Sequence, residues 1–194
     1  MLLSDYVLKL LEQKKIKNVF MITGGAIAFI VDAFSRNKKI EYTCVAHEQA
    51  AAMMADAYSR VGPNLGATMV TSGPGATNLI TGIACSWFDS VPTIHISGQV
   101  NQHELSGHDK NTSKVRQVGF QETDIVSIVK PITKFAYQLK NENEIKYIFE
   151  KACHIAQSGR PGPVLIDIPM NLQRKKIINN KLKSFKPIKE KVKQ

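Results

Sequence analysis

The sequence contains no apolar run approaching the roughly 18 to 20 residues that a membrane helix needs. Its first 15 residues mix acidic and polar residues with leucines, which predicts an amphipathic helix and not a signal peptide. The three cysteines lie far apart and without CxxC spacing, so neither a disulfide framework nor a zinc site is expected. We therefore expect a soluble, cytoplasmic protein with no membrane partner.

Acidic residues are scarce near the C-terminus, and this accounts for most of the net charge of +10. The residues after Met170 include nine lysines and arginines but only one acid, Glu190, so they carry +8 and leave +2 for residues 1–170. A charge of +2 spread over a folded surface argues against nucleic acid as a partner. Residues 173–194 are predicted to be a basic linker or tail, either solvated or able to bind a polyanion.

The remaining chain, residues 1–172, is long and apolar enough for one folded domain. Runs of apolar and β-branched residues predict six strands, at 18–22, 40–46, 66–71, 92–97, 133–139 and 163–168. Helical spacing or length predicts helices at 4–15, 26–36, 48–60, 78–88, 122–129 and 142–157. The alternation of strands with helices predicts a doubly wound α/β fold, whose mostly parallel six-stranded sheet has helices on both faces.

Three segments with unusual chemistry follow predicted strands: Thr23-Gly24-Gly25, His47-Glu48 and residues 71–78. Ligands of such sheets bind outside the carboxyl ends of the strands, so we expect these segments to converge. Glu48 opens the alanine-rich run EQAAAMMADAYSR at the start of a predicted helix. Two interpretations remain open: a favourable charge at the helix dipole, or a carboxyl that moves a proton in an active site.

The segment TSGPGATN, residues 71–78, predicts a tight turn after a strand, with Asn78 beginning the next helix. It supplies two glycines of a GxGxxG dinucleotide motif but lacks the third, and the sequence has no GxxxxGK[ST] phosphate loop. The residues alone are compatible with a plain strand-to-helix turn or with a ligand-binding loop.

The stretches TCVAHEQAAAMMADAYSRVG and TMVTSGPGATNLITGIACSWFDSVPTIHISGQV resemble the pyrimidine-binding domain of thiamine diphosphate enzymes of the acetolactate synthase and pyruvate oxidase type. The resemblance covers about residues 1–172. It implies that Glu48 is catalytic, because the family's matching glutamate hydrogen-bonds the cofactor's aminopyrimidine ring. It implies cofactor contacts for Glu48 and for residues of the two glycine-containing loops: Ile22, Thr23, Gly24, Gly25, Thr71, Pro74 and Asn78.

Further segments resemble the family or depart from it. Gly119-Phe120-Gln121-Glu122 resembles the segment that reaches towards substrate, which assigns Gln121 to the substrate side. Thr23 stands where the family often has proline, so we expect a less rigid loop and a changed substrate preference. The polar segment 101–118 is longer than in biosynthetic acetolactate synthases, and its two histidines lack a third ligand at suitable spacing. No metal ligand is assigned to this chain.

The resemblance implies an enzyme that decarboxylates a small 2-oxo acid and transfers or releases the activated aldehyde unit. The family's GDG segment and downstream asparagine, which hold the diphosphate and magnesium, have no counterpart here. The chain alone is therefore predicted to be inactive without a diphosphate-binding domain, and a homodimer or tetramer is expected. The resemblance leaves FAD open as a further cofactor. Two alternatives stay open: a separate subunit of a two-chain 2-oxo acid decarboxylase, and a non-catalytic dimerisation or regulatory module.

Overall fold

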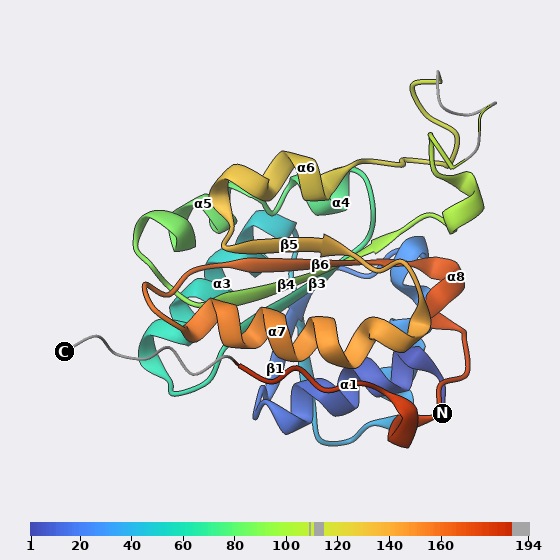
Figure 1. The fold of residues 1–194 in the computed structure, drawn as a ribbon. Helices are drawn as coiled ribbons and strands as arrows, with labels where there is room; N and C mark the ends of the chain where they lie inside the picture. The colour runs from blue at the N-terminus through green and yellow to red at the C-terminus, as the bar shows by residue number, and fades with distance from the viewer. Residues whose placement is uncertain (109, 111–114, 188–194) are drawn as a thin grey trace.

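A six-stranded sheet forms the centre of the computed structural model, which describes residues 1–108, 110 and 115–187 (Figure 1). The strands are β1 (Asn18–Met21), β2 (Glu41–Cys44), β3 (Gly66–Val70), β4 (Thr93–Gln99), β5 (Phe135–Gln138) and β6 (Val164–Pro169). Their order is β2-β1-β3-β4-β6-β5, and all neighbouring pairs run parallel. The predicted doubly wound α/β fold is confirmed, with each strand at its predicted place.

Helices cover both faces of this sheet (Figure 1). The α-helices are α1 (Leu3–Gln13), α2 (Ala28–Arg36), α3 (Glu48–Val61), α4 (Pro74–Thr77), α5 (Ile80–Phe88), α6 (Ile125–Val129), α7 (Ile145–Gln157) and α8 (Met170–Gln173). The short 3-10 helices are η1 (Gly25–Ile27), η2 (Gln102–Glu104), η3 (Lys130–Ile132), η4 (Glu142–Glu144) and η5 (Asn179–Lys181). Helices α1, α2 and α7 share one core, and α3, α5 and α6 pack on the opposite face.

Strand β6 shows how the sequence fills both cores. Val164, Ile166 and Ile168 belong to the core under α1 and α7, whereas Leu165 belongs to the core under α5 and α6. This alternation follows from the two-residue period of a strand. A strand between two apolar layers therefore needs apolar residues at nearly every position, which is why VLIDIP could be recognised as a strand.

Two helix starts differ from the prediction. The helix expected from Asn78 is α5, which begins at Ile80, and a short additional helix, α4, begins at Pro74 and ends just before Asn78. Proline suits the first position of a helix, and Gly73 precedes it with φ +60°, a conformation that favours glycine. The helix expected from residue 122 begins at Ile125, because the Asp124 side chain accepts a hydrogen bond from the Ser127 amide at 3.1 Å.

The first part of the predicted basic tail packs on the domain. Leu2 and Lys176 form an antiparallel bridge, and the side chains of Ile177 and Leu182 are buried. Farther along, the Phe185 ring lies 5.6 Å from the Tyr147 ring of α7. Residues 188–194 of that tail lie outside the described residues, and a domain boundary at residue 172 stays a prediction. No described helix combines the length and apolar character needed to cross a membrane.

Candidate functional site

The order of the strands changes direction beside β1. The chain passes from β1 outward to β2 and then returns to β3 on the other side of β1. Such a switch point opens a crevice at the carboxyl ends of the strands, where ligands of doubly wound sheets bind. Residues 22–25 follow β1, His47-Glu48 follows β2 and residues 71–78 follow β3. The three segments singled out in the sequence therefore lie around this switch point, and the region between Gly24, Glu48 and Thr71 is here called the crevice.

Glu48 is the first residue of α3 and is only 8% exposed. His47 caps the helix, since its Nδ1 accepts a hydrogen bond from the Gln49 amide at 3.1 Å. The Glu48 Oε2 atom accepts a hydrogen bond from Asn78 Nδ2 at 2.9 Å. A Cβ built on Gly75 would lie 3.4 Å from Glu48 Oε1. One carboxylate oxygen is thus held by an amide, and the other faces a glycine.

Thr71 joins the loops that follow β1 and β3. Its Oγ1 accepts a hydrogen bond from the Ala26 amide at 3.2 Å. A Cβ built on Gly24 would overlap the Thr71 side chain, and one on Gly75 would lie 2.7 Å from Thr71 Cγ2. Both glycines are required by this close packing, because any larger residue would push the loops apart. Gly24, Thr71, Gly75, Glu48 and Asn78 consequently form one continuous set of contacts.

Gln121, predicted on the substrate side, reaches the same loop through Gly73. It is exposed and has φ +56°, which is unusual for a residue with a side chain. A Cβ on Gly73 would lie 2.7 Å from both the Cβ and the carbonyl oxygen of Gln121. The sequence showed no sign of this contact, because the two residues are far apart in the chain.

The Glu122 carboxylate fixes the backbone beside Gln121. It accepts hydrogen bonds from the Ser106 amide at 2.6 Å, the Ser106 hydroxyl at 2.7 Å and the Val118 amide at 3.0 Å. Burial raises the pKa of Glu122, but bonds from Ser106, Val118 and Gly119 outweigh burial and leave this pKa below its usual value. An ionised Glu122 therefore joins Ser106 to Val118, two residues of the polar segment 101–118.

Four other predicted residues lack a described contact with Glu48. Ile22 is half-buried and Pro74 is exposed, and no hydrogen bond in the described part of the chain joins either residue to that carboxyl. Thr23 lines a separate groove of about 720 Å³ between α2 and β2. Gly25 has open space where a Cβ would be. Their roles at a cofactor stay predictions.

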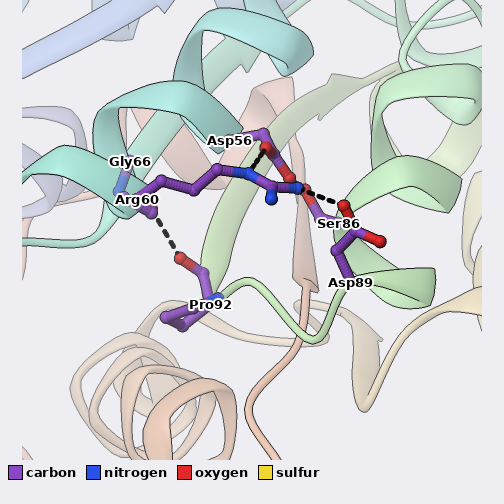
Figure 2. Close-up of polar contacts among 7 residues, drawn as sticks. Asp56, Arg60, Gly66, Ser86, Asp89 and Pro92 are labelled. Atoms are coloured by element: carbon purple, nitrogen blue, oxygen red, sulfur yellow. Dashed lines mark hydrogen bonds and ion pairs between the residues drawn. The ribbon is translucent and has the colours of Figure 1, made fainter.

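Polar contacts join the second half of α3 to α5. Asp56 accepts hydrogen bonds from Arg60 Nε at 2.5 Å and from the Ser86 hydroxyl at 2.8 Å. Figure 2 shows the Arg60 guanidinium between Asp56 and Asp89, whose Oδ2 is 2.6 Å from Arg60 Nη2. These contacts join α3, which begins at Glu48, to α5 and to the residue that follows it.

A buried polar row lies at the same edge of the sheet and was not predicted. Ser97, Asp167 and Gln138 are in register across β4, β6 and β5. Asp167 accepts hydrogen bonds from Ser97 Oγ at 2.7 Å, Gln138 Nε2 at 2.9 Å and Gln99 Nε2 at 3.1 Å. Burial raises the pKa of Asp167 to about 6, although these bonds oppose the shift. A single aspartate inside the apolar run VLIDI was the available signal.

Metal binding would need several His, Cys, Asp or Glu side chains close together. No set of three such side chains among the described residues has a suitable arrangement. His103 and His108 belong to the polar segment 101–118, of which residues 109 and 111–114 lie outside the described residues. The described geometry thus offers oxygen and amide groups at the crevice but no metal centre.

Comparison with known proteins gives consistent matches. Residues 1–128 match the family model described as "Thiamine pyrophosphate enzyme, N-terminal TPP binding domain". The chain is 43% identical over 172 residues to the acetolactate synthase large subunit of Buchnera aphidicola subsp. Acyrthosiphon pisum, covering 89% of this chain and 28% of the relative. It is 41% identical over 169 residues to the acetolactate synthase isozyme 3 large subunit of Escherichia coli K12, covering 87% and 28%. The chain thus spans little more than a quarter of these relatives.

Proposed function

The chain belongs to the thiamine pyrophosphate enzyme family, of which it matches the N-terminal TPP binding domain, and from this premise we propose that it is the pyrimidine-binding part of an acetolactate synthase-like enzyme. In this proposal the complete enzyme decarboxylates a 2-oxo acid and transfers or releases the activated aldehyde unit. One observation carries the proposal: the Glu48 carboxyl is nearly buried, accepts a hydrogen bond from Asn78 and follows β2, next to the point where the strand order reverses.

The residues at the crevice fit the aminopyrimidine ring of thiamine diphosphate. Glu48 Oε2 is already bonded to Asn78, which leaves Oε1 to face a ring nitrogen. Gly75 has no side chain beside Oε1, so a flat ring could approach the carboxyl closely. The packing of Gly24 on Thr71 brings the loop after β1 to the same place.

Thiamine diphosphate, when bound, supplies the electron sink for loss of carbon dioxide from a 2-oxo acid. Glu48 holds or shares a proton at Oε1, which a glutamine of the same shape cannot do. Asn78 keeps the carboxyl in one orientation, and the small alanines of α3 let neighbouring elements pack closely and exclude water. Gln121, near Gly73, lies on the substrate side.

Several parts of the enzyme would come from outside this chain. A diphosphate-binding domain, on the same polypeptide or a second one, would hold the diphosphate and magnesium, so the isolated chain is expected to be inactive. Pairing of two copies into a homodimer, or further into a tetramer, would complete the assembly. We place the enzyme in the cytoplasm because the sequence shows no disulfide framework.

The test uses a chimera in which this chain replaces the matched 169-residue region of the E. coli isozyme 3 large subunit. The hydrogen–deuterium exchange rate at the thiazolium C2 carbon is measured by NMR after acid quenching. Glu48→Gln is expected to lower this rate by at least about 10²-fold, the low end for general acid–base catalysis. Glu41→Gln, at an exposed residue of β2, is the matched control and should leave the rate unchanged.

Three outcomes decide the proposal. Loss of exchange in Glu48→Gln but not in Glu41→Gln supports it. Equal exchange in the original chimera and in Glu48→Gln would remove Glu48 from the mechanism. An assembled chimera that binds the cofactor but exchanges C2 no faster than free cofactor would favour a non-catalytic module.

A further inference from the structure

Gln173 is a fully buried glutamine that no step of the proposed reaction uses. It ends α8, directly after β6, and its Nε2 donates hydrogen bonds to two backbone carbonyls. One is Ile168 O of β6 at 2.9 Å, and the other is Ala26 O, 147 residues away, at 2.6 Å. The Oε1 atom of Gln173 makes no hydrogen bond with the described residues. The described hydrogen bonds of this side chain are therefore both donated by Nε2.

Ala26 is held from three directions. Its amide donates to Thr71 Oγ1 at 3.2 Å, and its carbonyl accepts from Gln173. Gly98 of β4 lies so close to Ala26 that a Cβ built on Gly98 would overlap the Ala26 carbonyl. Because the sheet runs in the order β1-β3-β4-β6, the loop after β1 passes across the ends of β3 and β4 to reach α8. The far end of this crossing is fixed by Gln173.

We propose that Gln173 is a positioning residue that holds the Thr23–Ala26 loop down on Thr71 and so sets the width of the crevice beside Glu48. The inference rests on the proposed function, which assigns this loop to the cofactor. A primary amide suits the task because it can donate to two carbonyls at once. Leucine offers no donor, and an ionised glutamate would present negative charge to two carbonyl oxygens.

The first experiment measures amide hydrogen exchange at Ala26 and Ile27 in the 194-residue chain without cofactor. Gln173→Leu is expected to raise the exchange rate at these amides by about 10-fold, since it removes the bonds that anchor the loop. Asn171→Leu is the matched control. This substitution also removes two hydrogen bonds made by a side-chain amide of α8, but these bonds go to Gln102 and not to the Thr23–Ala26 loop. The control should leave exchange at Ala26 within about 2-fold of the original chain.

The second experiment uses the chimera described above. Gln173→Leu should raise the thiamine diphosphate concentration needed for half-saturation by about 10-fold, corresponding to about 1.4 kcal/mol, whereas Asn171→Leu should not. C2 exchange at saturating cofactor should stay within about 3-fold, because Glu48 itself is unchanged. This separation of binding from chemistry is not expected of a residue that only stabilises the fold.

Several results would overturn the inference. Unchanged exchange at Ala26 in Gln173→Leu, or an equal rise in Asn171→Leu, would reduce Gln173 to general packing. Faster amide exchange at Ala26 with an unchanged thiamine diphosphate concentration at half-saturation would show that the loop does not influence cofactor binding. The proposed function fails on a different result, namely retained C2 exchange in Glu48→Gln, so the two failures are distinguishable.

Discussion

Ionisation of Asp167 should make this domain less stable as the pH rises from 4 to 8. Burial raises the pKa of this carboxyl from 3.8 to about 6, so the folded state holds its proton longer than the unfolded state does. Between these two pKa values the folded state binds more protons, and the free energy of unfolding therefore falls as pH rises. With 1.36 kcal/mol per pKa unit, the stability lost between pH 4 and pH 8 is about 2 to 3 kcal/mol.

The assay is urea unfolding of the chain and of its Asp167→Asn variant at several pH values from 4 to 8. Asparagine has a similar shape but no proton to lose, so the original chain should lose about 2 to 3 kcal/mol relative to the variant across this range. Most of the change should be complete near pH 6, where Asp167 becomes ionised in the folded state. Asp32→Asn removes an exposed carboxylate and controls for the change in net charge.

The sign of the difference is the decisive result. Parallel pH curves for the original chain and Asp167→Asn would refute a shifted pKa. A difference of opposite sign would mean that the donors from Ser97, Gln138 and Gln99 outweigh burial. That result would make the polar row a site that favours the charged carboxylate.

Three further predictions concern packing and protonation elsewhere. Gly66→Ala should destabilise the domain by about 1 to 3 kcal/mol in urea unfolding, because the new Cβ would overlap the Ala55 carbonyl. Gly25→Ala is the control: its Cβ meets open space, so stability should change by less than about 0.5 kcal/mol. Burial lowers the pKa of His95 to about 3, so its ring NMR signals should not titrate between about pH 5 and 8, and a midpoint in that range contradicts this. Asp56→Ala should lower the unfolding free energy by about 1 to 3 kcal/mol, since it removes the Ser86 bond that joins α3 to α5 and the Arg60 bond within α3. An unchanged denaturation midpoint would contradict this prediction.

Local sequence patterns were sufficient to predict the strands and to predict that the three loop segments meet at the crevice. Residues such as VLIDIP lie between two apolar layers, and that environment leaves a clear pattern in the sequence. The meeting of Glu48 with the glycine loops follows from a general property of parallel sheets, whose carboxyl ends share one edge. Asn78 was correctly placed near this edge, but it does not begin a helix: it lies between α4, which starts at Pro74, and α5, which starts at Ile80.

The contacts that were missed depend on lateral strand order, which a single sequence does not contain. Asp167 meets Gln138 and Ser97 only because β6 returns to lie between β4 and β5. The bond from Gln173 to Ala26 likewise requires the loop after β1 to cross two strands. Such contacts set how closely loops lie over the crevice, whereas the local motif sets which groups reach it. Residues that tune a site of this kind should therefore be sought among buried polar side chains after neighbouring strands, and Gln173 is the first to test.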